Sequence, residues 1–446
     1  MSEVIIDLQL KFTIPDSDLT INGIIQGIKE SHSEIIGAIF QTLLKALEER
    51  EIQKMMSAEP GRYVYNGHQR NARRLYSSLG NFYYQFRQLK DSKDGHTFAP
   101  LPGILSLPAY DHYLDEALEP GIGLAVHVSY RCSADEIKRI QGQSINHNTV
   151  HRRLQAFAEK CCQWPSMKDT PYLFLMADGT SVKLQGPSGQ DLGKADMRWA
   201  LASLGSGHPF ELVGFWIGDD WSTIRQDLEK RLDYDKLQIL FSDGGPGILE
   251  NLLRAGMEPQ RCQWHGKRDF PYILYADGFK KTEQTELKEK LNAIPAMRIT
   301  KSDLEKLQPE DYPLVEHIVE KTKQGFQELL EILTPDKYPK ARVYIENLSQ
   351  SVTTFLDWWL EKQEVIPLNT NAIESAFSRV VNRIKKVGKR WSEKGLLNWL
   401  KIALHKVFKP ENWFQVWSNA LSLEPKVILS DLKASYRWVD YSITYP

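Results

Sequence analysis

The sequence has little cysteine and no long hydrophobic run, and both absences exclude whole classes of protein. Its four cysteines, Cys132, Cys161, Cys162 and Cys262, form no Cys-x-x-Cys pair, so neither a disulfide framework nor a zinc finger is indicated. We find no apolar stretch long enough to span a bilayer. The N-terminus carries acids where a secretory signal would carry basic residues. We therefore expect a cytoplasmic protein with no membrane partner.

An excess of charge of one sign is also missing, because the formal net charge is −1. The average hides a basic stretch between residues 379 and 409, in which only Glu393 opposes the basic side chains. Such a stretch can contact DNA phosphates even when the whole protein is not basic. A solvated helix face is an alternative interpretation. Its members are Arg379, Arg383, Lys385, Lys386, Lys389, Arg390, Lys394, Lys401, Lys406 and Lys409.

The 446 residues are 42% hydrophobic and 25% charged, which is typical of a soluble globular chain with several domains. We see neither an internal repeat nor a low-complexity segment. The patterns predict six segments: a helical or dimerisation region that begins with a short strand (1–60), a small antiparallel β unit (61–110), a helix-turn-helix (111–165), the first part of an α/β core (166–280), an all-α insertion (281–365), and a final core helix with a basic C-terminal region (366–446).

Residues 132–157 predict a helix, a turn and a second helix. Ser133 would cap the first helix, Gly142 would supply the turn, and Ser144 would cap the second helix. In a helix-turn-helix the second helix enters the DNA major groove, although a plain helical hairpin gives a similar pattern. The side chains expected to read bases or phosphates are Asn146, Asn148, His151, Arg152 and Arg153.

Two aspartates and a distant glutamate are the most informative residues. Asp178 and Asp243 each end a predicted apolar strand and are followed by glycine, and Glu374 lies in a helical pattern 131 residues after Asp243. The topology we predict places the two strands side by side. An aspartate before glycine is alone more often a turn or cap residue than a catalytic one. The combination of two such strands with a distal glutamate favours a catalytic site.

Three carboxylates of this kind suit a pair of divalent ions that hold phosphodiester DNA. One ion would activate the attacking water or 3′-hydroxyl, and the other would stabilise the leaving oxygen. We therefore expect two Mg²⁺ ions as cofactors, with Mn²⁺ as an alternative, bound by Asp178, Asp243 and Glu374. Double-stranded DNA is the expected partner, and the protein would be associated with the nucleoid when bound to it.

Four further residues are candidates for supporting roles. Cys262 and His265 are expected on a fifth strand beside the carboxylates, where two ligands are too few for a closed zinc site. Asn371 could fix the start of the helix that carries Glu374. Arg379 could meet a phosphate or pair with Glu374.

Trp358 and Trp359 lie late in the predicted insertion. Either ring could stack on a DNA base. Packing in the core of the insertion is the favoured interpretation.

Several of these motifs resemble DDE transposases of the Mutator-like superfamily encoded by prokaryotic insertion sequences. The segment NTNAIES around Glu374 carries the resemblance most strongly, and FSDGGPGI, CQWH and SYRCSADEIKRIQGQSINHNTVHRRLQ add to it. It covers roughly residues 60–410. The N-terminal region lacks the cysteine pairs that relatives often carry. The acidic first 60 residues have no counterpart that we can place.

This resemblance implies an RNase H-like catalytic core with an all-α insertion after its fifth strand. It also implies that Asp178, Asp243 and Glu374 are the DDE triad. The implied activity is metal-dependent cleavage of element ends and strand transfer into target DNA by a homo-oligomer. Two alternatives remain open: a domesticated DNA-binding protein that does not cleave, and an RNase H-like structure-specific nuclease.

Overall fold

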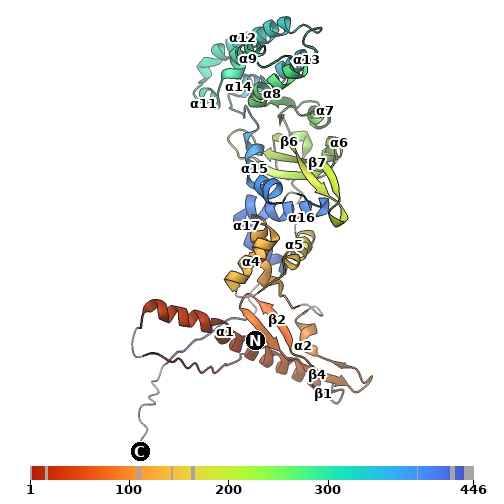
Figure 1. The fold of residues 1–446 in the computed structure, drawn as a ribbon, viewed down its shortest axis with the longest axis vertical. Coiled ribbons are helices and arrows are strands. Elements are labelled where there is room, and N and C mark those ends of the chain that lie inside the picture. The colour runs from red at the N-terminus through yellow and green to blue at the C-terminus, as the bar shows by residue number, and fades with distance from the viewer. Residues whose placement is uncertain are drawn as a thin grey trace, which may run out of the picture. The chain divides into compact units, whose positions relative to one another are not determined.

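The fold is mixed α/β, with more helix than strand. Contacts divide the chain into two compact units, one formed by Met1–Pro120, Ile140–Gln143 and Glu411–Pro446, the other by Gly121–Arg139 and Ser144–Pro410. The six-segment division stays a prediction. The structure, a computed structural model shown in Figure 1, describes residues 3–15, 19–107, 112–141, 144–161, 166–388, 390–421 and 427–435.

The first unit is organised around one long helix, α1 (Ile21–Ala58). Thr20 caps it by accepting a hydrogen bond from the Gly23 amide. The expected strand at the N-terminus is wrong, because residues 3–15 have no regular structure. Their alternating pattern suits a strand, but no neighbouring strand pairs with it. The buried residues of α1 all lie in its second half, from Gly37 onwards.

Small antiparallel sheets follow α1, as the sequence predicts. β1 pairs with β4, which pairs with β5, and β2 pairs with β3. Leu44 of α1 packs with Leu75 and Phe86 in the core of this unit. The elements are β1 (Tyr63–His68), β2 (Arg73–Ser77), β3 (Gly80–Tyr84), β4 (Arg87–Asp91), β5 (Thr97–Phe98), α2 (Pro100–Ile104), η1 (Asp115–Leu118) and α17 (Pro410–Leu421).

The second unit is built on a mixed five-stranded sheet in the order β10-β9-β6-β7-β8. β6, β7 and β8 form an antiparallel meander, while β9 and β10 run parallel to β6. Helical segments connect the parallel strands. These elements are β6 (Phe174–Gln185), η2 (Pro187–Gly189), β7 (Asp191–Ser203), β8 (Glu211–Ile217), α6 (Trp221–Arg231), η3 (Tyr234–Lys236), β9 (Ile239–Ser242), α7 (Ile248–Leu252) and β10 (Glu258–Arg261).

Alternation along the strands gives the sheet two different faces. Leu175, Ala177 and Leu240 point to the face that α6 and α7 cover, where they join one buried cluster. Phe174 and Phe241 point to the other face and contact each other there, with ring centres 5.6 Å apart. By the same alternation the residues at even positions of β6 lie on this second face.

Helices flank the sheet region in sequence (Figure 1). The predicted fifth strand is too long. β10 ends at Arg261, and the helix α8 follows it. The remaining elements are α3 (Glu119–Ala125), α4 (Tyr130–Gln141), α5 (His147–Cys161), α8 (Gln263–Ala276), α9 (Thr285–Ala293), α10 (Pro295–Arg298), α11 (Lys301–Leu304), η4 (Pro309–Asp311), α12 (Tyr312–Ile332), α13 (Pro339–Ser349), α14 (Thr354–Lys362), α15 (Asn371–Val381), the π-helical turn η5 (Asn382–Val387), α16 (Glu393–Ala403) and the π-helical turn η6 (Leu404–Phe408).

Trp199 anchors α15 to the second face of the sheet. Its ring is fully buried and lies 4.8 Å from the Phe377 ring of α15 and 5.8 Å from the Phe408 ring. Trp199 is also the residue of β7 that pairs directly with Asp178 of β6. The packing that holds α15 on the sheet is therefore centred on the strand residue that pairs with Asp178, one of the candidate carboxylates.

We expect Trp199→Ala to lower the free energy of unfolding of this unit by about 3–5 kcal/mol, because it removes a fully buried ring and leaves a cavity. Urea denaturation would measure the loss. Leu192→Ala on the same strand is the matched control. Leu192 is 56% exposed, so its removal should change stability by at most about 0.5 kcal/mol. Equal losses in the two variants would contradict the anchoring role of Trp199.

Candidate functional site

Strand pairing brings the two aspartates to the same level of the sheet. The parallel pairing of β6 with β9 ends at Ala177 opposite Ser242, so Asp178 and Asp243 are the next residues on neighbouring strands. The prediction that Asp178 ends its strand is wrong, since β6 continues to Gln185, paired with β7 and, at Leu184, bridged to Trp391. The apolar run stops at Asp178 because the strand is less buried from there on.

Asp178 is a buried carboxylate with an unusually high proton affinity. Its side chain is 7% exposed, and one oxygen accepts a hydrogen bond of 2.6 Å from the Gly179 amide. Burial raises the pKa of Asp178 to about 7, and the negative charges of Asp243 and Glu374 add to the effect. Asp243 and Glu374 are therefore close enough for their charges to act on Asp178.

A tight glycine turn holds Asp243 just beyond β9. The Gly245 amide donates a 2.7 Å hydrogen bond to the Asp243 carboxylate. Gly244 has φ +88°, a backbone conformation that side chains rarely tolerate. A Cβ atom at Gly244 would also collide with the guanidinium of Arg261. The backbone conformation is therefore the main reason for glycine at this position, and a larger residue would also displace the Arg261 side chain.

Glu374 reaches the site from the first turn of α15. Ile373, Ala376 and Val380 form the buried face of this helix, at the spacing of an amphipathic helix. Glu374 lies beside that face and is partly exposed. The third carboxylate thus comes from a helix packed on the sheet, as the sequence predicts.

A hydroxyl group links Glu374 to a buried histidine. Thr370 is fully buried, and its Oγ1 lies 3.4 Å from Glu374 Oε1 and 3.4 Å from His265 Nδ1. His265 Nδ1 is itself 3.7 Å from Glu374 Oε1. Sequence reasoning missed Thr370. Its position directly before the α15 helix, where threonine is a frequent cap, was the available signal.

Cys262 and His265 lie at the start of α8 and not on a strand, which corrects the prediction. Cys262 precedes the helix, and its amide donates to the Ser242 carbonyl. Burial alone would raise the pKa of Cys262, but hydrogen bonds with His265 and Thr370 lower it below its usual value. Burial would lower the pKa of His265, but the hydrogen bond and charge of Cys262 raise it overall.

Asn371 has different surroundings from those expected, whereas the phosphate contact expected of the exposed Arg379 stays a prediction. Asn371 is exposed, and its amide donates to the Asn369 side chain at 3.1 Å, so Asn369 and not Asn371 supplies the side chain that orders this turn. The Arg379 guanidinium lies 5.6 Å from the centre of the Phe408 ring.

Trp358 and Trp359 belong to the core. They are 8% and 2% exposed, and the Trp358 ring contacts Phe174 of the sheet. Their packing in a core is confirmed, but the Trp358 ring packs against the sheet and not only within the predicted insertion.

The helix-turn-helix segment has different caps from those predicted. Ser133 lies inside α4, where its hydroxyl donates to the Gly121 carbonyl at 2.6 Å. Ser129 receives the Cys132 amide and acts as the cap instead. Asn146 precedes α5 and accepts a 2.8 Å hydrogen bond from the Asn148 amide, in place of the expected Ser144. Gly142 lies outside the described residues.

Most of the proposed reading side chains on α5 face solvent. Asn146, Asn148, His151 and Arg152 are exposed, while Arg153 is half-buried. His151 also packs edge-to-face on Tyr130, with ring centres 4.9 Å apart.

The basic stretch after α15 contains one residue that cannot serve as a phosphate contact. Arg383 is 5% exposed, donates to the Ala125 carbonyl at 3.2 Å, and lies over the rings of Trp391 and Trp399. Burial lowers the pKa of Arg383. The sequence did not distinguish it from its exposed basic neighbours.

The other proposed phosphate contacts near Arg383 remain at the surface. Lys385 and Lys386 are exposed, and Lys385 donates to the Thr180 hydroxyl at 2.7 Å. Arg390 pairs with Asp191. Lys389 lies outside the described residues.

The three carboxylates do not form a closed metal site by themselves. Among the described residues, no group of three or more His, Cys, Asp or Glu side chains is placed to hold an ion by itself. Magnesium characteristically takes one or two carboxylates and completes its shell with water and substrate phosphates. The buried Asp178 carboxylate, repelled by Asp243 and Glu374, is a group that such a cation would stabilise.

We expect the stability advantage of Asp178→Asn over the wild type, both without metal, to grow as the pH rises from about 4 to about 8. Because the pKa of Asp178 rises from 3.8 to about 7 on folding, the folded wild type binds the proton more tightly and loses stability over this interval. The gain should be on the order of a few kcal/mol. Urea denaturation at the two pH values would measure it.

Asp235→Asn serves as the control, since Asp235 is exposed. A gain in Asp178→Asn that is the same at both pH values would contradict the role assigned to burial and repulsion.

Comparison with solved structures finds weak similarity to a transposase complex. No protein-family model matches the chain, and no curated protein matches it. Among solved structures, the chain is similar to the Drosophila P element transposase strand transfer complex, with 12% sequence identity over 65% of this chain and 91% of that chain. The TM-score of 0.35 denotes weak overall similarity. No helix in the described ranges is long and apolar enough to cross a membrane.

Proposed function

We propose that this protein is a DNA transposase that cleaves element ends and joins them to target DNA through Asp178, Asp243 and Glu374. The convergence of these carboxylates carries the proposal. Two of them directly follow the last paired positions of the parallel strands β6 and β9, and the third comes from a helix that packs on Trp199, the β7 residue paired with Asp178. Repulsion between these carboxylates at a buried position destabilises the folded protein. A reaction that uses a bound cation would explain why the protein keeps them close together.

We further propose that the five-stranded sheet is an RNase H-like core. The family that the sequence resembles has an all-α insertion after its fifth strand. Here α9 to α14 follow β10, the fifth strand of the sheet along the chain, and precede the helix with Glu374. The sheet order, with β6 central and the meander on one side of it, supports the same proposal.

Asp178, Asp243 and Glu374 would hold two Mg²⁺ ions between them, with Mn²⁺ as an alternative. When bound, the ions would activate an attacking oxygen and stabilise the leaving oxygen. Asp178 would lose its proton on binding, since metal ligands must be ionised. Thr370 and His265 would orient the Glu374 carboxylate through the contacts described above.

The reaction would proceed as two in-line phosphoryl transfers at one site. In the first, water attacks the phosphorus at the element end and a 3′-hydroxyl leaves. In the second, that 3′-hydroxyl attacks a target phosphodiester and displaces another 3′-oxygen. Exposed residues of α5 and the exposed cations Lys386 and Arg390 would contact the DNA. A homo-oligomer would bring the two element ends together.

Excision from a plasmid that carries the gene's own flanking DNA tests this proposal. We expect Glu374→Gln and Asp243→Asn to reduce Mg²⁺-dependent excision by more than about a hundredfold, the upper range for losing only an outer-shell partner. Glu361→Gln is the matched control, because Glu361 is exposed on α14 and should retain wild-type excision. Equal excision by the wild type and Glu374→Gln would remove Glu374 from the site.

Supplying a pre-cut end with a free 3′-hydroxyl separates the alternatives. Joining of that end to target DNA supports a transposase, whereas cleavage without joining supports a structure-specific nuclease. Specific binding of the flanking DNA without either reaction would support a non-cleaving DNA-binding protein.

Thr370 gives a second prediction. We expect Thr370→Val to lower excision by about 10–100-fold, the range for residues that orient a metal ligand, because valine keeps the buried shape but removes the hydroxyl. Thr370→Ser should restore most of the activity. A circular dichroism spectrum would confirm the fold of both variants, and wild-type activity in Thr370→Val would refute the orienting role.

A further inference from the structure

The outer face of α8 carries aromatic and basic side chains in an unusual arrangement. Trp264, Tyr272 and Tyr275 are 50%, 70% and 69% exposed, and Arg268 is exposed between them. At 3.6 residues per turn these four residues fall within an arc of about 80° on one side of the helix. We call this set the α8 stripe.

The opposite face of α8 explains why the α8 stripe faces outward. Phe270 and Leu274 are fully buried in the core of the helical region, and a Cβ atom at Gly266 would press against Leu348. The helix is therefore fixed in rotation. Large flat side chains on its free side are not needed for that packing, and exposed apolar surface of this kind commonly marks a binding site.

The α8 stripe begins beside the three carboxylates. Trp264 directly precedes His265, which lies 3.7 Å from Glu374, and the Trp264 ring packs edge-to-face on the His265 ring. The guanidinium of Arg268 lies 4.8 Å from the centre of the Trp264 ring. From there the stripe continues along the helix to Tyr275.

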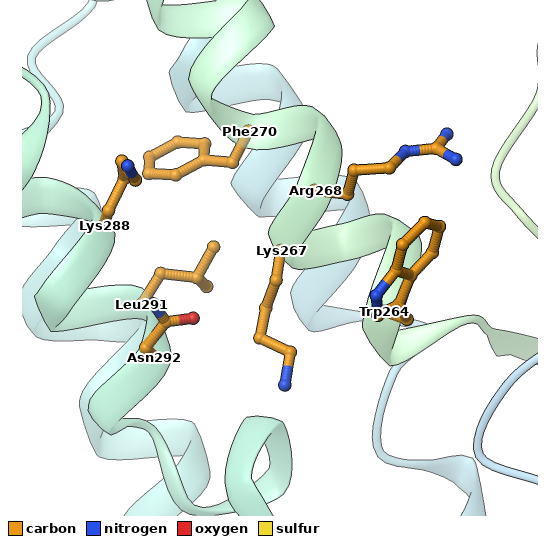
Figure 2. Close-up of a pocket in the computed structure, with 7 residues that line it drawn as sticks. All are labelled: Trp264, Lys267, Arg268, Phe270, Lys288, Leu291 and Asn292. Atoms are coloured by element: carbon orange, nitrogen blue, oxygen red, sulfur yellow. The ribbon is translucent and has the colours of Figure 1, made fainter. Parts of the chain in front are cut away.

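A pocket adjoins the start of the stripe, between α8 and α9 (Figure 2). Its volume is about 340 Å³, and Trp264, Lys267, Arg268, Lys288 and Asn292 are among its lining residues. Figure 2 shows Lys288 and Asn292 on α9 across from the α8 side chains. The Lys267 ammonium donates to the Met297 carbonyl at 2.9 Å. Asp269 pairs with Arg268 at 2.6 Å, and the charges of Glu374 and Asp243 also act on Arg268 and raise its pKa.

Rings with exposed faces, interleaved with cations, are the chemistry that binds single-stranded nucleic acid. Unpaired bases stack on aromatic side chains and the backbone phosphates meet the cations. A DNA duplex would meet the cations as well, but its base faces are covered by stacking and could not use the rings. An acidic peptide would leave the ring faces without partners.

We propose that the α8 stripe and the adjoining pocket bind unpaired nucleotides of the DNA strand that leads to or from the cleaved bond. This proposal rests on the proposed function, because only a strand cut at the three carboxylates would run past Trp264. Bases stack on Trp264, Tyr272 and Tyr275, while Lys267, Lys288 and Arg268 contact phosphates. Strand separation next to the cleaved bond would then be stabilised by the protein.

The test is fluorescence anisotropy with a labelled 15-nucleotide oligothymidine and, separately, a labelled duplex. The full chain carrying Asp243→Asn is used throughout, so that cleavage does not interfere. Adding Trp264→Ala should weaken oligothymidine binding about tenfold, and adding Tyr272→Ala together with Tyr275→Ala should do the same, in line with the worth of a stacked base. Duplex binding should change by less than about twofold.

Tyr83→Ala is the matched control, because Tyr83 is a 59% exposed tyrosine of the first unit. Trp264→Phe keeps a ring and should recover most of the lost affinity. The two tyrosine changes are at the surface and remain readable if Trp264→Ala fails to fold. Oligothymidine affinity unchanged in every stripe variant would overturn the proposal, as would an equal loss for oligothymidine and duplex.

Failure of the proposed function would look different. If the protein carrying only Asp243→Asn excised DNA as well as the wild type, the triad would fail. The anisotropy measurements would still decide, independently of excision, whether the α8 stripe binds oligothymidine.

Discussion

The parallel pairing of β6 with β9 is the constraint on which the candidate site depends. It fixes two chain segments in register up to Ala177 and Ser242, so that two carboxylates must emerge together. Like charges this close repel each other, and burial strengthens the repulsion. The arrangement persists because the strands are held by hydrogen bonds and by cores on both sheet faces. Stability elsewhere in the unit offsets the strain of the site.

Much of the sheet follows from sequence pattern. Apolar runs mark the buried parts of β6 and β9, and acidic residues mark the points at which burial ends. Sequence pattern fails to predict a strand where the strand is not buried, or where an alternating segment has no partner strand. β6 continues beyond Asp178 as a half-exposed arm of a hairpin, and the alternating residues 3–15 form no strand. A strand needs a partner as well as a suitable pattern, and partners are not visible in a single segment.

The candidate site was predictable in its charged groups and less so in what surrounds them. Asp178 and Asp243 stand out because carboxylates directly after apolar runs are uncommon, and Glu374 stands out through the segment NTNAIES around it. Thr370 does not stand out, since a threonine before a helix is ordinary and only its burial gives it a role. Arg383 shows the reverse error, because a basic residue among basic residues was assigned to the surface. Burial of individual polar side chains depends on tertiary packing and leaves little trace in local sequence.

The helical region between β10 and α15 has a consequence for the order in which the site is completed. Asp178 and Asp243 lie on strands that are close in sequence, but Glu374 follows only after α9 to α14. Closing so long a loop costs more conformational entropy than pairing strands that are near in sequence, and it is therefore slower. During synthesis, the ribosome releases both aspartates long before the glutamate. A chain that ends before α15 would therefore carry both aspartates without the glutamate, and the candidate site would lack its third carboxylate.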